Sequence, residues 1–398
     1  RLMRATDMLN KILNYWISRN LEEIEQGTFK LVLPDTEETI LLHGKSNLNL
    51  EATLEVKSWK ALWLIYSRGS LGFTEGYLEN YWDTDDLMKL MDLISKNYNS
   101  FDRVNSGSGF WKLLTKFSHF RNENSLSGSK KNIHAHYDLG NDFYESWLDE
   151  TMTYSSGFFE RNSDSLKEAQ NRKYKLILDT LGLPKNSSIL EIGCGWGGFL
   201  EYASSVGYKI KGITISQEQF KFASNRIKGL TNDPEIELID YRKLKGKFDA
   251  VVSIEMFEAV GSKYWKTYFD VVKQLLKSNG QALIQTITMK EDFYGGYHDW
   301  PDFIQTYIFP GGELSSDKVF KENAANSELI ASDITNFAGS YAKTLEIWYK
   351  NFQKKWDAIG EIGFDEKFKR TWDMYLSYCR GGFLNNQLEV SQYKLTHK

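Results

Sequence analysis

From residue 165 onward, short apolar runs alternate with segments of helical periodicity. The apolar runs have the length and composition of buried strands and cover residues 188–192, 209–215, 235–239, 248–254 and 281–288. Helical patterns occupy residues 166–183, 197–205, 217–227 and 263–276. This alternation predicts an α/β fold with a doubly wound, parallel sheet. Ligands bind such sheets at the carboxyl ends of the strands, so the residues that follow each strand are candidates for a functional site.

The first part of the chain has a different pattern and predicts a smaller α+β domain. A chain of 398 residues is long for one domain and favours two. Helical patterns at 2–24, 58–67 and 85–96 combine here with short strand patterns at 28–33 and 39–43. We predict an N-terminal domain at 1–121, a polar, Gly/Ser-rich linker at 122–131 and a second domain at 132–398.

Composition argues against several classes of protein. The formal net charge of −4 does not suit a general polyanion binder, so we predict no nucleic-acid partner. The two cysteines, Cys194 and Cys379, form neither a disulfide framework nor a zinc motif, which predicts reduced thiols, a cytoplasmic protein and no metal. We find no run of about 18 apolar residues that could span a membrane. Residues 110–117 are basic, aromatic and roughly amphipathic, which fits either a helix at a membrane surface or a helix that joins the two domains.

A glycine-rich segment, residues 191–198, lies between the first predicted strand of the second domain and the helix that follows it. Glycines allow a sharp turn and let the backbone approach a ligand closely, as nucleotide sites require. Two details favour S-adenosylmethionine (SAM) over a dinucleotide. Glu191 stands at the strand end, where it can accept a hydrogen bond from a ligand ammonium, which a dinucleotide lacks. The spacing E-x-G-x-G-x-G also differs from the dinucleotide pattern G-x-G-x-x-G.

The next two predicted strands end in further candidates. The second strand carries no acid for ribose hydroxyls, and Ser216 and Gln219 have the spacing of a capping box that opens the next helix. The third strand is followed by Asp240, which can bond an adenine amine, and by Tyr241, which can pack on the ring. These two residues are a weak signal by themselves.

Several further segments, at 69–77, 136–144, 153–156 and 255–261, accompany the glycine-rich segment. Together they resemble the cyclopropane-fatty-acyl-phospholipid synthase family, over both domains from about residue 69 to the C-terminus. The resemblance implies a Rossmann-like SAM-dependent methyltransferase domain, preceded by a smaller domain that contacts lipid and supports a homodimer. It also implies an enzyme of the cytoplasm that is peripheral to the inner face of the membrane.

The resemblance further implies a reaction. Family enzymes transfer the SAM methyl to a cis double bond in the acyl chain of an unsaturated phospholipid, which leaves a carbocation. Loss of a proton from the new methyl then closes a cyclopropane ring, with a bound bicarbonate as the proton acceptor. Such chemistry needs a shielded, apolar site with carboxylate or aromatic groups near the cation. The many aromatic residues between 293 and 349 fit the wall of an acyl-chain tunnel or an ordinary core.

The family's site residues transfer to this sequence as three sets. The implied SAM contacts, besides Glu191, are Tyr154, Ser155, Gly193, Cys194, Gly195, Gly197, Thr214, Ser216, Gln219, Asp240 and Tyr241. The implied bicarbonate contacts are Ser156, Glu258, Gln285, Ile287 and Tyr341. The implied catalytic residues are Glu258, Tyr341 and Cys379, of which Glu258 is the strongest candidate because a carboxylate beside an apolar pocket can orient bicarbonate and stabilise a cation.

Three positions depart from the family's pattern. Ser156 replaces a Cys, Gln285 replaces a His, and Ala259 stands where many members have a His. Glutamine has no titratable nitrogen, so Gln285 can bind an anion but cannot relay a proton. These departures leave open a fatty-acyl C-methyltransferase, which would form a methylene or methyl branch.

Two more distant alternatives are weaker. A small-molecule N-methyltransferase would share the run 255–258, but the continuation 259–261 and the N-terminal domain argue against it. A non-catalytic lipid-binding protein would not need the intact glycine-rich segment or Glu258.

Overall fold

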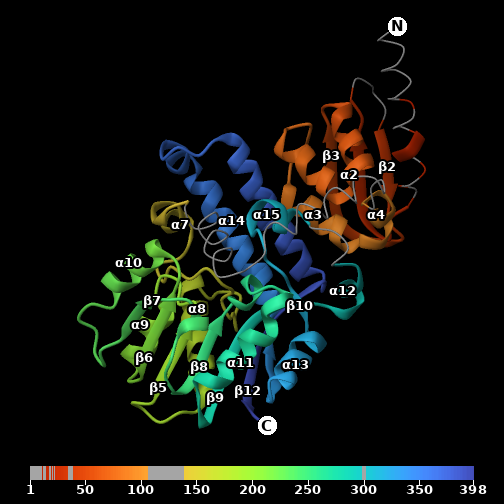
Figure 1. Ribbon diagram of the computed structural model, residues 1–398. Coiled ribbons are helices and arrows are strands. Elements are labelled where there is room, and N and C mark those ends of the chain that lie inside the picture. The colour runs from red at the N-terminus through yellow and green to blue at the C-terminus, as the bar shows by residue number, and fades with distance from the viewer. Residues whose placement is uncertain are drawn as a thin grey trace. The chain divides into compact units, whose positions relative to one another are not determined.

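A computed structural model describes residues 23–34, 39–105, 139–297 and 302–398, together with residues 11, 15–17, 19 and 21. The chain forms two compact units, which we describe separately (Figure 1). Unit 1 contains Arg1–Arg121, Asp299–Tyr307 and Trp356–Asn385, and unit 2 contains Asn122–His298, Ile308–Lys355 and Asn386–Lys398. The linker predicted at 122–131, the amphipathic segment at 110–117 and part of the family segment at 136–144 lie outside the described residues.

Unit 1 is an α+β unit, as predicted for the start of the chain. Its sheet has the order β2-β1-β3-β4, formed by β1 (Gln26–Val32), β2 (Thr39–His43), β3 (Ser46–Val56) and β4 (Trp82–Asp83). The helices described in it are α2 (Trp59–Leu78), α3 (Leu87–Lys96), α4 (Tyr98–Asn105) and α15 (Glu366–Leu384). The long strand β3, which pairs in parallel with β1, has no counterpart in the sequence prediction.

Helix α15 corrects the predicted domain boundaries. The sequence predicts one continuous domain at 132–398, whereas residues 356–385 and 299–307 cluster with unit 1. The reason is the packing of α15, whose buried face includes Trp372, Leu376 and Phe383 and which contacts α3 and α2. The Arg370 side chain adds a hydrogen bond to the Tyr77 carbonyl oxygen, at 2.5 Å.

Unit 2 contains the predicted α/β sheet. The strand order is β11-β12-β9-β8-β5-β6-β7, with β10 paired to β9. The strands are β5 (Ser188–Ile192), β6 (Lys209–Thr214), β7 (Glu235–Leu238), β8 (Phe248–Ile254), β9 (Leu276–Met289), β10 (Ser315–Ser316), β11 (Leu329–Asn336) and β12 (Leu388–His397). Strands β5 to β9 are parallel, as predicted, whereas β11 and β12 add an antiparallel edge that the sequence analysis did not anticipate.

Helices cover both faces of this sheet, as a doubly wound fold requires. The helices described in unit 2 are α7 (Asn141–Trp147), α8 (Leu166–Leu181), α9 (Gly198–Ser205), α10 (Gln217–Arg226), α11 (Trp265–Leu275), α12 (Glu291–Tyr297), α13 (Asp317–Asn326) and α14 (Ala338–Glu361). Helix α14 belongs to unit 2 as far as Lys355. Ile189 and Leu190 are neighbours in β5 but belong to different apolar clusters, one with α8 and α9 and the other with α11 and α13. The predicted fold class is therefore confirmed for unit 2.

Short turns complete the described structure: η2 (Tyr241–Lys243), η3 (Phe257–Ala259), η4 (Ser262–Tyr264) and η5 (Ile304–Ile308). Within the part of the chain that the structure describes, none of the helices has the length and apolar character needed to cross a membrane.

Candidate active site

The glycine-rich segment turns sharply after β5. Gly193, Gly195 and Gly197 all have left-handed φ angles, of 78°, 52° and 84°, which favour glycine. The backbone N–H groups of Gly193 and Cys194 both donate to the Ile213 carbonyl oxygen, at 3.0 Å, which ties the turn to β6. A Cβ at Gly193 would lie 2.7 Å from the Met256 side chain, whereas one at Gly195 would meet no atom within 4 Å. The turn is therefore packed against Met256 at Gly193 and open at Gly195, where a ligand can approach the backbone.

Glu191 provides a test of whether this loop suits SAM. Its side chain is 3% exposed, and within the described structure its Oε2 atom is buried without a hydrogen-bond partner. Burial raises the pKa of Glu191 to about 8, while the charge of Lys173 opposes the rise. A buried carboxylate oxygen without a donor is costly, and a ligand ammonium would satisfy it. SAM carries such a group, so the residues present fit this cofactor.

The polar residues after β6 bond mainly to one another. Ser216 caps α10 by accepting a hydrogen bond from the Gln219 backbone N–H, at 3.3 Å, as the capping pattern predicts. The Gln219 side chain does not complete a capping box, because its Oε1 atom accepts from the Thr214 hydroxyl, at 2.9 Å. All three residues are buried at the carboxyl end of the strand. Their predicted role as SAM contacts remains a prediction.

Asp240 and Tyr241 lie where the sequence places them, just beyond the end of β7. The Asp240 carboxylate is held by Arg242, whose backbone N–H donates at 2.9 Å and whose Nη2 atom lies 2.6 Å away. Tyr241 packs edge-on against Tyr268, with 5.7 Å between the ring centroids. The Asp240 carboxylate is therefore already paired with Arg242. Its predicted hydrogen bond to adenine would need a carboxylate lone pair that Arg242 does not use.

Tyr154 belongs to an aromatic cluster in unit 2, which also contains Tyr144, Trp147 and Trp348. The ring of Tyr154 lies 5.5 Å from that of Tyr144, 5.6 Å from Trp147 and 5.3 Å from Trp348, between centroids. Tyr341 adjoins the cluster through Trp348, at 6.3 Å. Aromatic faces attract positive charge, so such a cluster suits a sulfonium or a carbocation.

The aromatic residues predicted to line one tunnel are divided between the units. Phe309, Tyr341 and Trp348 belong to unit 2, and the Phe309 ring lies 6.3 Å from that of Tyr154. Phe303 and Tyr307 belong to unit 1, where their rings lie 5.7 Å apart, and Trp300 lies outside the described residues.

The predicted bicarbonate ligands meet a carboxylate that the sequence analysis passed over. Glu255 Oε1 accepts hydrogen bonds from the Ser156 backbone N–H, at 3.0 Å, and from Gln285 Nε2, at 2.8 Å. Glu255 Oε2 accepts from the Tyr341 hydroxyl, at 2.6 Å. The sequence predicts that these three residues contact a bicarbonate ion, and that role remains a prediction. In the structure their donors meet at the Glu255 carboxylate. The position of Glu255 directly after β8 was the signal that could have identified it.

Sheet register explains this meeting. Ile254 pairs with Gln285 across β8 and β9, and the Glu255 backbone N–H donates to the Gln285 carbonyl oxygen, at 2.8 Å. Gln285 in turn stands opposite Gln392 across β9 and β12, and Gln392 Nε2 donates to Gln285 Oε1, at 3.0 Å. Directly opposed residues of an antiparallel pair share a face, so Gln392 orients the Gln285 amide toward Glu255.

Glu258 occupies the turn η3, three residues after Glu255 in sequence. Its Oε1 atom accepts from the Ile287 backbone N–H, at 2.5 Å, and from the Thr286 hydroxyl, at 3.0 Å. Among the described residues its Oε2 atom has no hydrogen-bond partner and is buried. Burial, and then the negative charge of Glu255, raise the pKa of Glu258 to about 8. Two buried carboxylates in one site titrate as a pair, so one of them holds a proton more readily than the other.

Lys173 is a second residue that the sequence analysis missed. This lysine of α8 is fully buried, and its Nζ atom donates to Ser155 Oγ and to Gln170 Oε1, both at 2.6 Å. Burial lowers its pKa to about 8, against the charges of Glu255 and Glu191 among others. The helical spacing places position 173 on the buried face of the predicted helix. Lysine is rarely buried unless it is paired, so a lysine on that face was the signal that could have identified it.

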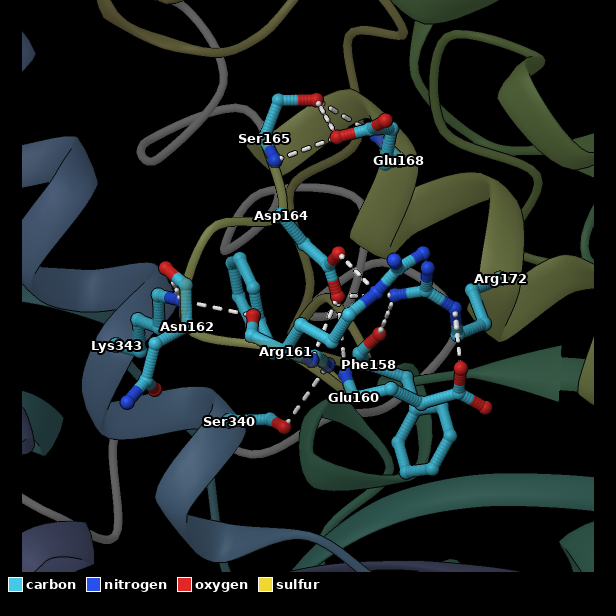
Figure 2. Close-up of polar contacts among 11 residues, drawn as sticks. Phe158, Glu160, Arg161, Asn162, Asp164, Ser165, Glu168, Arg172, Ser340 and Lys343 are labelled. Atoms are coloured by element: carbon cyan, nitrogen blue, oxygen red, sulfur yellow. Dashed lines mark hydrogen bonds and ion pairs between the residues drawn. The ribbon is translucent and has the colours of Figure 1, made fainter.

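The loop that follows Ser156 is tied to helix α14, the helix of Tyr341, as Figure 2 shows. Asp164 organises the loop by accepting from the Arg161 backbone N–H, at 2.8 Å, and from Arg172 Nη1, at 2.5 Å. The Phe159 backbone N–H then donates to Ser340 Oγ in α14, at 3.1 Å. These contacts fix the segment that presents Ser156 relative to the helix that presents Tyr341.

Cys379 is not part of these contacts. It lies in α15 of unit 1, whereas the carboxylates and their donors belong to unit 2. Burial, and then the charge of Asp302, raise the pKa of the Cys379 thiol above its ordinary value. A thiol in this environment is a poor nucleophile, since the thiolate is the reactive form. Its predicted catalytic role remains a prediction.

We expect Glu191→Gln to weaken SAM binding and yet to stabilise the ligand-free protein. The loss of a charged hydrogen-bond partner should lower SAM affinity by about tenfold or more. The folded pKa is about 8, above the ordinary value of 4.5, so Glu191 stabilises the fold below that ordinary value, and this contribution disappears as the pH rises to about 8. Glutamine removes that dependence, so the gain in unfolding free energy should be largest near pH 8.

Calorimetry with SAM and denaturant unfolding without it, at about pH 5 and about pH 8, would measure both effects. The exposed Glu322→Gln is the matched control. Unchanged SAM affinity in Glu191→Gln would remove Glu191 from the cofactor site.

The chain is similar to known proteins over most of its length. The family model of mycolic acid cyclopropane synthetase matches residues 124–393. The chain is 35% identical over 342 residues to tuberculostearic acid methyltransferase of Mycobacterium tuberculosis, covering 82% of this chain and 79% of that protein. It is also 35% identical over 349 residues to cyclopropane-fatty-acyl-phospholipid synthase of Escherichia coli (strain K12), covering 87% of this chain and 88% of that protein.

A solved structure extends the likeness to three dimensions. A mycolic acid cyclopropane synthase, crystallised with S-adenosylhomocysteine (SAH) and CTAB, has a TM-score of 0.63 and 29% sequence identity. The match covers 68% of this chain and 98% of that chain. These findings establish SAM as the cofactor and the chain as an enzyme. The open glycine turn fits this cofactor, as does the buried Glu191 oxygen that lacks a hydrogen-bond partner among the described residues. The chain belongs to the cyclopropane synthase family of SAM-dependent methyltransferases.

Proposed function

We propose that this enzyme modifies a cis double bond in the acyl chain of an unsaturated phospholipid and forms a cyclopropane ring. The observation that carries the proposal is the pair of buried carboxylates, Glu255 and Glu258, at the carboxyl end of β8. A methyltransferase that acts on an amine or a hydroxyl group has no need to stabilise a carbocation, whereas alkene chemistry needs negative charge in an apolar site. The names of the family members that the chain resembles support the same reaction.

When bound, SAM supplies an electrophilic methyl group to one alkene carbon and leaves positive charge on the other. The glycine turn and Glu191 would hold the cofactor. The aromatic cluster around Tyr154 would shield the cation from water and stabilise it with ring faces. Once ionised, Glu258 would stabilise the same cation with its Oε2 atom, which has no hydrogen-bond partner among the described residues.

Contact with the membrane is part of this proposal, because the substrate's acyl chain lies in a bilayer. Unit 1 supports it with exposed aromatic side chains, Trp63 at 44% and Tyr66 at 39% exposure, whose rings lie 5.8 Å apart. Aromatic rings of this kind favour membrane interfaces. We propose peripheral binding from the cytoplasm to the inner face of the membrane, and the homodimer implied by the family remains a prediction.

The test is to incubate the enzyme with labelled SAM and vesicles of unsaturated phospholipid, and to analyse the released acyl chains by mass spectrometry. We expect each modified chain to gain one CH₂ and to resist hydrogenation, as a ring does. Methylation of amines without any lipid product would overturn the proposal. Sedimentation with the same vesicles tests membrane binding independently of turnover.

A second candidate is a fatty-acyl C-methyltransferase that forms a methylene or methyl branch. The specific observation in its favour is the 35% identity to tuberculostearic acid methyltransferase, which equals that to the cyclopropane-forming relative. A product that gains one CH₂ and then takes up hydrogen would identify a methylene branch. A product with a saturated methyl branch would require a separate reductant.

A further inference from the structure

We propose that Glu255 is the built-in proton acceptor of this enzyme and takes the place of the bicarbonate ion that the family resemblance implies. The inference rests on the proposed function, because it names the base for that reaction. Ser156, Gln285 and Tyr341, which the resemblance implies for bicarbonate binding, already donate hydrogen bonds to the Glu255 carboxylate.

The shape and charge of the two anions explain the replacement. A carboxylate and a bicarbonate ion both present two oxygens on a planar carbon with one negative charge. Glu255 uses both oxygens to accept from Ser156, Gln285 and Tyr341, at 2.6–3.0 Å. A bicarbonate ion in this position would have to displace the side chain from three hydrogen bonds and stand beside its negative charge. Bicarbonate therefore does not fit while Glu255 is there.

The backbone at Glu255 is the second, independent observation. Its φ angle is +50°, in the left-handed region that glycine tolerates and other residues seldom adopt. Such a conformation is unfavourable for a residue with a side chain. Strained positions of this kind cluster at functional sites, where the side chain that they aim has a use. Here the strained residue aims its carboxylate at the donors from three separate segments of unit 2.

The charge distribution places the negative charge on Glu255 before reaction. Glu255 accepts three hydrogen bonds and is attracted by the ammonium of Lys173. Glu258 accepts two hydrogen bonds and is repelled by Glu255. More donors and a nearby cation favour the ionised form, so Glu255 is the member of the pair that is ready to take a proton.

The proton step then balances without another reactant. A C–H bond of the transferred carbon breaks, and its electron pair forms the C–C bond that closes the ring on the cationic carbon. The proton goes to a carboxylate oxygen of Glu255, which becomes a neutral acid and returns the proton to water before the next turnover. Burial raises the pKa of Glu255, which makes the carboxylate a stronger base than an exposed one.

The first experiment needs no variant. In buffer freed of carbon dioxide, turnover of the full chain with SAM and unsaturated phospholipid vesicles is measured with and without added bicarbonate, at fixed pH and ionic strength. We expect the two rates to agree within about twofold, because an internal base replaces one that would contribute about 10²-fold or more. A clear dependence of the wild-type rate on bicarbonate would overturn the proposal.

The second experiment restores the external ion. Glu255→Gly suits the left-handed backbone and leaves space where the carboxylate was. Without bicarbonate its turnover should fall by about 10²-fold or more, and added bicarbonate, bound in that space, should raise the turnover of the variant by at least about tenfold. Glu255→Gln fills the same space without a base and should not recover. Glu322→Gln, at an exposed position, is expected to behave as the wild type.

A third readout does not depend on activity. Without SAM or lipid, bicarbonate should raise the unfolding midpoint of Glu255→Gly at fixed pH, because a ligand that binds only the folded state stabilises it. The wild type and Glu255→Gln should show no such rise beyond that caused by matched chloride. A Glu255→Gly variant that binds SAM but shows neither stabilisation nor recovery would overturn the proposal.

These outcomes separate the two proposals. A wild type that binds SAM but modifies no lipid would contradict the proposed function, while the unfolding experiment would still show whether Glu255 fills an anion site. If Glu255→Gly does not fold, the wild-type bicarbonate experiment decides alone: independence supports the built-in base and dependence overturns it.

Discussion

Replacing Glu258 with Gln is expected to lower turnover by about 10²–10³-fold while SAM affinity stays within about twofold of wild type. Glu258 has one buried oxygen without a hydrogen-bond partner among the described residues, which leaves it available to stabilise a cation. Glutamine keeps the size of the side chain and can still accept from Ile287 and Thr286 through its carbonyl oxygen, but it cannot become negative. The effect should therefore appear in the rate constant and not in cofactor binding.

The pH dependence gives this prediction a sharper form. Because the pKa of Glu258 is raised to about 8, its ionised fraction and the turnover should both increase with pH up to about that value. This rise should be absent in Glu258→Gln. Single-turnover rates across this pH range, with SAM affinity from calorimetry and Glu322→Gln as control, are the measurement. Loss of SAM binding would instead assign Glu258 to the cofactor site.

Glu258→Gln should also stabilise the ligand-free protein. A carboxyl group with a raised folded pKa stabilises the fold below its ordinary value of 4.5 and loses this contribution as the pH approaches about 8. A variant that is more stable near pH 8 and nearly inactive would show that the carboxyl group is kept for function at a cost in stability.

Lys173→Met is expected to lower turnover by about tenfold to 10²-fold and to move the ionisation of Glu255, and the turnover that depends on it, to higher pH. Lys173 is fully buried, and its charge favours the ionised forms of both Glu191 and Glu255. Methionine fills similar space without that charge, so both carboxyl groups will hold their protons to higher pH. The variant also leaves Ser155 Oγ and Gln170 Oε1 without their donor.

A matched control lies in the same helix. Lys175 is exposed and pairs with Asp179 on the surface of α8. Lys175→Met should therefore change neither the turnover nor its pH dependence. The measurement is the pH profile of turnover together with SAM affinity for both variants. A Lys173→Met enzyme with reduced turnover but an unmoved pH profile would show that Lys173 acts only as a structural residue.

Local features of unit 2 could be predicted because they depend on nearby residues. The strands at Ser188–Ile192 and Phe248–Ile254 begin and end where their apolar runs do. The turn after β5 needs left-handed angles that its glycines supply, and Ser216 caps the helix that follows it. The carboxyl ends of the strands are where a parallel sheet presents its ligand site, and the candidates after β5, β6 and β8 lie at those ends.

Only the tertiary structure decided which side chains meet. Ser156, Gln285 and Tyr341 are far apart in sequence, and the register of β8 on β9 and the placement of α14 bring them to Glu255 rather than to Glu258. The same holds for helix α15, whose packing on α3 and α2 assigns Cys379 to unit 1. Strand length, turns and caps follow from short-range conformational preference, whereas a hydrogen-bond partner depends on strand register and helix packing. The sequence therefore determined the fold class and the cofactor loop, and the packing decided which carboxylate the site is built around.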